Sequence, residues 1–456
     1  GPEQPLWLER LDTEHDNLRA ALEWAKEHGE RAQALRLAGA IWRFWLVRGY
    51  VSEGRARLAE LLEPSAEQAD MSSGTNGPTR AAALHGAGML AFSQGDYAAA
   101  RALHEQALEM CGALGDQRCT ADALHGLGDA AYAQGEYAAA QDLYEQSLAI
   151  RRELGDRWGT AQALASLGQV PTAQGNYAAA RAHYQESLAI QNDLGDRQGA
   201  AASLWSLGWV AWFQGDYTSA AAWIAEGLQI QRELGDKRSV SLSLNLLGDV
   251  HVQKGDYGTA RPLLEEGLAI YRDLEDRWGL ARSLSLLGEL SYQEGDSATA
   301  RHFLDQGMKI YRELGERRGT GRSLSVLGRV ALDTGDLSAA RSWLLESLEI
   351  HRELNHRFGL AHSLDGLAAL AAAQGRSRSA LNLAGAAAAL RDAAGAVVSP
   401  AGQARLEQLL APAREALGVA GSQAAWMEGR TMSLEQAARA IAECLAPDEQ
   451  VGGRNG

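Results

Sequence analysis

Several features are scarce in this chain of 456 residues, and each shortage excludes a class of protein. The 3 cysteines, Cys111, Cys119 and Cys444, have neither the number nor the spacing of a disulfide framework or a metal site, so we expect idle thiols in a reducing cytoplasm. Only four of the 43 basic residues are lysines, and the net charge is -15. Because the arginines are scattered among carboxylates, we expect no contact with nucleic acid or with an anionic membrane.

Long apolar runs and catalytic signatures are also missing. No stretch of about 18 uncharged apolar residues occurs, and the start GPEQPLWLERLD lacks the basic and apolar regions of a signal peptide. The sequence contains no G-x-x-x-x-G-K-[ST], G-x-S-x-G, H-E-x-x-H or C-x-x-C motif. Asp122, His125 and Asp129 share one helical face, and we interpret them as a polar groove rather than a metal site. We therefore expect a cytoplasmic, non-enzymatic protein with no cofactor and no bound metal.

The residues that are present repeat every forty positions. Glycine, alanine and leucine recur at this spacing, in columns that begin at Gly88, Gly95, Ala100 and Leu84. Seven units keep the register without an insertion, and an eighth, from about Arg357, decays. Each unit has the apolar spacing of two helices of about 17 residues, with glycine ending one helix and an acidic residue capping the next. Since one unit cannot bury its apolar face alone, the repeat predicts an α-solenoid.

These columns resemble the signature of the tetratricopeptide repeat (TPR). One copy reads Leu124, Leu127, Gly128, Ala131, Ala140, Tyr144 and Ser147, and the match continues over roughly residues 79–391. The resemblance implies an all-α, right-handed TPR superhelix of about eight helix-turn-helix units, whose first helices line a concave groove. Pro171 inside a first helix predicts a kink. Glu275 stands at a turn where most other units have glycine, and it predicts strain or a reshaped turn.

The regions on either side of the array are helical but out of register. We expect an N-terminal helical region with a degenerate repeat at residues 1–63, a polar linker or loop at 64–79, the TPR array at 80–391 and capping helices at 392–456. The sequence Ser433-Leu434-Glu435-Gln436 is a capping box that predicts the start of a last helix.

Both flanks resemble bacterial STAND-type, LuxR/AfsR-like regulators. The resemblance is carried by LERLDTEHDNLRAALEW at residues 8–24 and by WMEGRTMSLEQA at 426–437. It implies the sensor and autoinhibitory segment of such a regulator, without its nucleotide-binding module but docking on that ATPase module. The alternative is a freestanding adaptor that scaffolds protein complexes.

Residues on the groove side of the first helices vary between units, whereas the packing columns do not. Tryptophan and arginine, two residue types that often dominate binding energy, gather on this side. We predict that a peptide or protein segment, or a small ligand, binds there, with its acidic portion on arginine and its apolar anchor on tryptophan. The predicted set is Tyr132, Trp205, Trp209, Trp212, Asn245, Arg282, Tyr292, Arg322 and Arg329. The alternative is that these tryptophans pack between helices and the arginines pair with local carboxylates.

Overall fold

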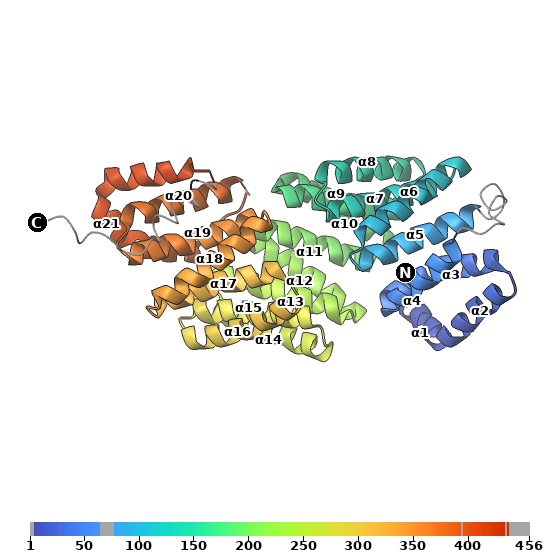
Figure 1. Cartoon of the computed structure of the whole chain (residues 1–456), viewed down its shortest axis with the longest axis horizontal. Coiled ribbons are helices and arrows are strands. Elements are labelled where there is room, and N and C mark those ends of the chain that lie inside the picture. The colour runs from blue at the N-terminus through green and yellow to red at the C-terminus, as the bar shows by residue number, and fades with distance from the viewer. Residues whose placement is uncertain (1–3, 64–76, 394, 434–435, 437–456) are drawn as a thin grey trace, which may run out of the picture. The chain divides into compact units, whose positions relative to one another are not determined.

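The computed structural model describes residues 4–63, 77–393, 395–433 and 436, and it places this part of the chain in helices α1 to α21 (Figure 1). No strand occurs among these residues, so the predicted all-α class is confirmed. The contacts divide the chain into unit 1 (residues 1–173 and 178–200) and unit 2 (174–177 and 201–456). We describe each unit by itself.

Unit 1 opens with four helices around an aromatic core. These are α1 (Gln4–Thr13), α2 (His15–Glu27), α3 (Arg31–Arg48) and α4 (Val51–Leu62). Helices α3 and α4 form a hairpin whose turn uses Gly49 in the left-handed conformation, at φ 82°. Trp45 is 1% exposed, and Gly54 lets α4 lie directly against it, since a Cβ atom there would be 2.6 Å from the Trp45 ring.

The array continues as helix pairs. In unit 1 they are α5 (Gly77–Ser93), α6 (Tyr97–Leu114), α7 (Gln117–Ala133), α8 (Tyr137–Glu153), α9 (Arg157–Gln174) and α10 (Tyr177–Leu194). In unit 2 they are α11 (Arg197–Phe213), α12 (Tyr217–Leu234), α13 (Lys237–Lys254), α14 (Tyr257–Asp273), α15 (Arg277–Gln293), α16 (Ser297–Glu313), α17 (Arg317–Asp333), α18 (Leu337–Glu353), α19 (Arg357–Ala373) and α20 (Ser377–Ala393). We call the odd-numbered members A helices and the even-numbered members B helices. Helix α5 begins inside the segment predicted as a linker, of which residues 64–76 lie outside the described part.

The glycine column explains how closely the A and B helices approach. A Cβ atom on Gly128 would lie 2.6 Å from the ring of Tyr144, and one on Gly248 would lie 2.5 Å from the side chain of Leu264. Both distances are shorter than carbon atoms tolerate, so only glycine allows this packing. In one unit the Ser147 hydroxyl adds a hydrogen bond of 2.8 Å to the carbonyl oxygen of Ala121, which ties the B helix to the A helix.

The turns follow the predicted chemistry. Gly95 has a φ of 78°, and the carboxylate of Asp96 accepts a hydrogen bond from the Ala99 N–H at the start of the next helix. Glu275 keeps the left-handed conformation at φ 53°, so the turn is not reshaped, and a side chain there costs energy that glycine avoids. Helix α9 continues past Pro171 to Gln174, so the proline does not end the helix, and the kink stays a prediction.

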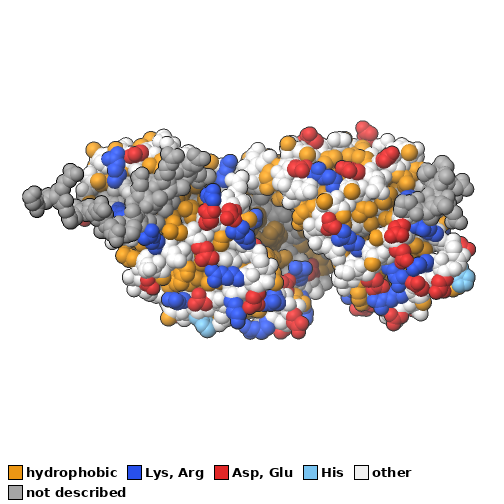
Figure 2. Space-filling model, in the orientation of Figure 1, with side chains coloured by type: hydrophobic (Ala, Val, Ile, Leu, Met, Phe, Trp, Pro, Cys, Tyr) orange, Lys and Arg blue, Asp and Glu red, His pale blue; other side chains and the backbone are white. Residues whose placement is uncertain are grey.

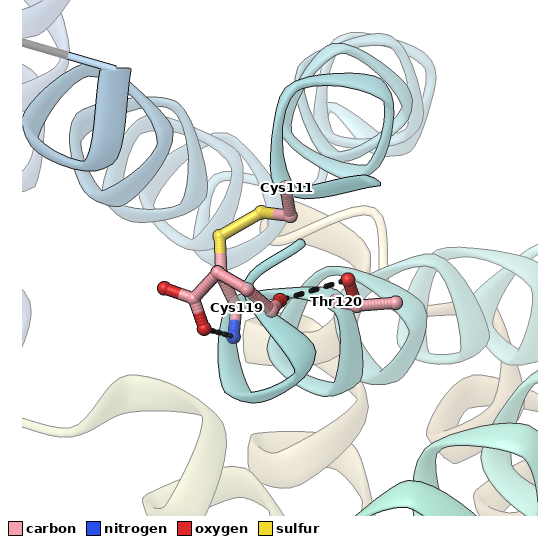
Figure 3. The surroundings of a disulfide bond; sticks show 4 residues. Cys111, Cys119 and Thr120 are labelled. Atoms are coloured by element: carbon pink, nitrogen blue, oxygen red, sulfur yellow. Dashed lines mark hydrogen bonds between the residues drawn. A yellow bond between two sulfur atoms is a disulfide. The ribbon is translucent and has the colours of Figure 1, made fainter. Parts of the chain in front are cut away.

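A disulfide corrects the expectation of idle thiols. It joins Cys111, at the end of α6, to Cys119, in the first turn of α7 (Figure 3). Their Cα atoms are 5.6 Å apart, within the usual range for a disulfide. Sequence spacing did not reveal this pair because the turn between two antiparallel helices, not the motif, brings the thiols together. Cys444 lies outside the described residues.

Helix α21 (Pro400–Arg430) follows the array and covers the last hairpin. Its helical conformation is interrupted at Gly418, where φ is 67° and ψ is 176°. Gly429 lies so close to the backbone of Asn382 in α20 that a Cβ atom would be 2.0 Å from its carbonyl oxygen. The predicted capping box has both of its hydrogen bonds, between Ser433 and Gln436, while residues 434–435 and 437–456 lie outside the description.

The surface carries charges of both signs. Figure 2 shows basic and acidic side chains interspersed over the visible face, as the scattered arginines in the sequence indicate. Among the helices that the structure describes, none combines the length and the apolar character needed to cross a membrane.

Candidate functional site

Eight of the nine predicted site residues gather on four consecutive A helices of unit 2. They lie on α11, α13, α15 and α17, and we call the side of these helices that carries them the inner face of unit 2. The ninth, Tyr132, lies in unit 1, where it is half-buried and its ring centroid is 5.7 Å from that of Tyr137.

Three tryptophans of α11 form a stack. The ring centroids of Trp205 and Trp209 are 5.8 Å apart, those of Trp209 and Trp212 are 5.5 Å apart, and both pairs are within 7° of parallel. Trp205 and Trp209 are half-buried and keep open ring surface. Trp212 is only 8% exposed and contacts Phe358 of α19, with centroids 5.7 Å apart. The prediction that Trp212 lines an open groove is therefore corrected, since its surface is used in packing.

Asn245 and Tyr292 are also packing residues rather than lining residues. Asn245 is 0% exposed, and its amide nitrogen donates to the Ser283 hydroxyl at 2.9 Å. Tyr292 is 1% exposed, and the guanidinium groups of Arg329 and Arg405 lie over its ring at 5.1 Å and 4.3 Å. Their burial corrects the prediction, because a side chain without exposed surface cannot touch a ligand in this conformation.

Two of the three predicted arginines pair with carboxylates of the chain itself. Arg322 lies 2.8 Å from a carboxylate oxygen of Glu289 and 3.3 Å from one of Asp249, and Arg329 lies 3.8 Å from Glu289. The expectation that Arg322 and Arg329 wait for an acidic ligand is corrected in favour of the alternative, local ion pairs. The sequence places Asp249 and Glu289 on the same helical faces as the other predicted residues. It does not indicate that Arg322 pairs with Asp249, which is 73 positions away.

The electrostatics of this network follow from burial. Burial raises the pKa of the Asp249 carboxyl, against the opposing effect of Arg322. Burial also acts to raise the pKa of Glu289, but Arg322 and Arg329 together outweigh it and hold that pKa below its usual range. Glu289 is therefore the ionised centre of the network, and Arg322 bridges α13, α15 and α17.

Arg282 differs from these arginines. Its guanidinium carbon lies 6.0 Å from the ring centroid of Trp209 and 5.6 Å from that of Trp278. In the described part of the chain it has no carboxylate within ion-pair distance. The side chain is half-buried, while Trp278 is 37% exposed. Cation–π contacts thus hold a charged group in place without neutralising it.

Sequence reasoning missed a segment that reaches the end of this face. The N–H of Val397 donates to the carbonyl oxygen of Phe213 at 3.3 Å, and Arg405 of α21 forms an ion pair with Asp333 of α17. The segment therefore lies at the C-terminal ends of α11, α15 and α17, where it covers the ring of Tyr292. Nothing in the spacing of residues 395–405 indicated this position.

The polar cluster in unit 1 has structural partners. His125 Nε2 lies 3.8 Å from a carboxylate oxygen of Asp129 and 3.3 Å from the Ser166 hydroxyl oxygen. Tyr144 donates to Asp129 at 2.8 Å, and Arg151 pairs with Asp122 at 2.6 Å. No group of three or more metal-ligating side chains gathers within the described residues. The cluster is therefore polar packing around the A helices.

The repeats match known families. Residues 79–153 and 159–233 match the family model of the tetratricopeptide repeat, and residues 199–356 match that of the MalT-like TPR region. The chain belongs to the tetratricopeptide-repeat proteins. The MalT-like match includes the TPR helices α11 to α18 that carry the inner face of unit 2, from Trp205 to Arg329.

Solved structures with low sequence identity share the TPR fold. The apo quorum sensor NprR from B. thuringiensis is 13% identical, with a TM-score of 0.55 over 77% of this chain and 99% of that one. A STAND protein with a tetratricopeptide repeat sensor from Pyrococcus horikoshii is 14% identical, with a TM-score of 0.53 over 73% and 51%. The Rap conjugation regulator of plasmid pLS20, in complex with the Phr* peptide, is 15% identical, with a TM-score of 0.51 over 74% and 95%.

A short stretch resembles curated proteins. A protein named as an HTH-type transcriptional regulator in Mycobacterium tuberculosis is 41% identical over 54 residues, and its counterpart in Mycobacterium bovis gives the same values. These residues are 12% of this chain and 6% of the length of those regulators.

Proposed function

We propose that this TPR array is the non-enzymatic sensor segment of a bacterial STAND-type transcriptional regulator in the cytoplasm. Three similarities support this assignment: the MalT-like TPR region over residues 199–356, the short match to HTH-type regulators, and the STAND protein from Pyrococcus horikoshii among the structural neighbours. The sequence motifs at residues 8–24 and 426–437 point to the same class of regulator.

The observation that carries the proposal is the half-open indole stack of Trp205 and Trp209 beside Arg282. Exposed aromatic surface next to a charged group without a carboxylate partner adds little to the stability of the fold, whereas both are favourable contacts for a partner. The ligand is a peptide, a protein segment or a smaller molecule with an apolar part. A structural neighbour solved with the Phr* peptide supports a peptide.

Binding at this face would be transmitted through the arginine network. Arg322 contacts carboxylates from α13 and α15, so a shift of α15 changes the ion pairs of three A helices at once. We propose that the ligand stabilises one arrangement of these helices and thereby alters docking on the regulator's own ATPase module. Such a shift requires different ligand affinities for the two arrangements.

The test compares ligands across three versions of the protein. Peptides and small metabolites are screened by thermal denaturation against the wild-type chain, the double variant Trp205→Ala, Trp209→Ala and the control Trp24→Ala. Trp24 is 53% exposed and lies in unit 1. We expect ligands that raise the Tm of the wild type and the control but not of the double variant. ATP hydrolysis by the complete gene product should then respond to the same ligands.

The recognition proposal fails if every ligand that stabilises the wild type stabilises the double variant equally while circular dichroism shows intact helices. The regulator proposal fails separately if a ligand binds at the tryptophans but the complete gene product neither binds nor hydrolyses ATP. That second outcome would favour the freestanding adaptor.

A further inference from the structure

Arg282 differs from the other half-buried arginines described for the inner face of unit 2. Arg322 and Arg329 pair with Glu289, and Arg405 pairs with Asp333. Arg282, in the second turn of α15, has cation–π contacts with Trp209 and Trp278, interacts electrostatically with Tyr311 and Tyr271, and has no carboxylate within ion-pair distance among the described residues. Arg282 is therefore a half-buried cation of this face that no carboxylate of the described residues neutralises.

The partial burial of Arg282 without a carboxylate partner costs free energy, and a ligand with a negative charge can reduce this cost. A guanidinium group stays charged in proteins, so burial penalises it instead of deprotonating it. In agreement, burial lowers the pKa of Arg282 and the charge of Arg322 lowers it further, while Tyr311, and less strongly Tyr271 and Asp249, oppose this shift. Asp249 is already engaged by Arg322 at 3.3 Å. An incoming anion would supply the charge that Arg282 lacks.

The two indoles determine how an anion could approach. The guanidinium carbon lies 6.0 Å from the Trp209 ring centroid and 5.6 Å from that of Trp278, and a guanidinium in contact with aromatic rings keeps its N–H groups for an anion. Trp278 is 37% exposed and Trp209 is half-buried, so this part of the face reaches solvent. A ligand whose anionic group pairs with Arg282 would lay its neighbouring atoms on these rings.

The surrounding charge favours a monoanion. Glu289 and Asp249 lie on the same face and would repel a doubly charged phosphate more than a singly charged carboxylate. A carboxylate also matches the two parallel N–H groups of a guanidinium. The stack of Trp209 on Trp205, with centroids 5.8 Å apart, offers an apolar surface for the rest of the ligand.

We propose that Arg282 binds the single carboxylate of a ligand whose apolar or aromatic part rests on Trp205 and Trp209. This inference rests on the proposed recognition role of the same face and adds the chemistry of the ligand. The carboxylate has two sources with the same chemistry, the C-terminus of a peptide with a large apolar last residue and a small aromatic acid.

The experiment measures how much the negative charge of the ligand contributes to its binding affinity. Isothermal titration calorimetry compares 3-phenylpropionate with its amide, and a short peptide ending in phenylalanine with its C-terminally amidated form. For the wild-type chain we expect at least one acid to bind about tenfold or more tightly than its amide, as one charge-assisted contact provides. In Arg282→Gln this ratio should fall to about one, whereas Arg282→Lys should keep part of it.

The controls separate the possible failures. Arg272→Gln, at an exposed arginine of α14, should leave the ratio unchanged. Equal binding of acids and amides by the wild type, a ratio that persists in Arg282→Gln, or no binding of either acid up to about 10 mM overturns the carboxylate assignment. If the amides bind and lose affinity in the Trp205→Ala, Trp209→Ala variant, the proposed function survives without this inference. Preference for the peptide or for the small acid identifies the source.

Discussion

Replacing His104 with leucine is expected to raise the free energy of unfolding of unit 1 by about 1–3 kcal/mol, the usual cost of a buried polar group without a partner. His104 is 0% exposed in α6, and neither ring nitrogen has a hydrogen-bond partner among the residues that the structure describes. Leucine should fit, because the pair of glycines facing His104 recurs around Leu344 as Gly328 and Gly366.

The same substitution should remove the contribution of His104 to the pH dependence of the stability of unit 1. Burial, and then the charges of His85 and His125, lower the pKa of His104 from 6.5 to about 3. Between these values the unfolded chain binds a proton that the folded chain does not, so stability falls as the pH decreases from 6.5 toward 3. Each pH unit in this window costs about 1.4 kcal/mol for one such histidine. His85, with a pKa lowered by burial to about 4, keeps its own contribution in the variant.

Urea denaturation at pH 7, 6 and 5, followed by circular dichroism, measures both effects. Since a repeat array can unfold in parts, hydrogen exchange of peptides from α5 to α8 assigns the change to unit 1. His302→Leu, at an exposed histidine, is the control. Lower stability of His104→Leu at pH 7, or an unchanged slope between pH 6 and 5, would refute the argument that the buried imidazole is an unpaired neutral group.

Four further substitutions test three separate features. Glu275→Gly should raise the free energy of unfolding by about 1 kcal/mol in thermal denaturation, because glycine adopts a φ of 53° without strain. Asn355→Gly should raise it less, because asparagine tolerates this conformation. Equal gains from the two substitutions would contradict the reasoning. Cys119→Ser should cost the oxidised protein about 2–3 kcal/mol and abolish the effect of a reductant on its Tm. Arg322→Gln should lower the free energy of unfolding of unit 2 by about 3 kcal/mol or more in urea, because it removes the closest partner of Glu289. A decrease below about 1 kcal/mol would contradict the role of Arg322 as that partner.

The repeat itself was predictable because its causes are local. A glycine at 128 and a tyrosine at 144 belong to one hairpin, so their spacing reports a contact that the period repeats. Helix ends are equally local, since Asp96 caps a helix that begins at the next residue. Sequence analysis therefore predicted the helix pairs and their turns.

The candidate site was less predictable because its contacts join distant repeats. Arg322 meets Asp249 across 73 positions, and Trp212 meets Phe358 across four repeats. Such contacts depend on how successive hairpins turn relative to one another, which no single column of residues encodes. Helical spacing could place Arg282 on the same face as Arg322, but it could not tell which of them the fold neutralises.

The segment that runs from Val397 to Arg405 gives unit 2 a closure that simple repeat stacks lack. In such a stack only neighbours interact, so the ends fray independently. Here the Val397 bond to Phe213 links the segment before α21 to α11, and the Arg405 pair with Asp333 links α21 to α17. Detachment of residues 397–405 would withdraw contacts from α11 and α17 together, so unit 2 should melt as one body instead of unfolding repeat by repeat from its C-terminal end.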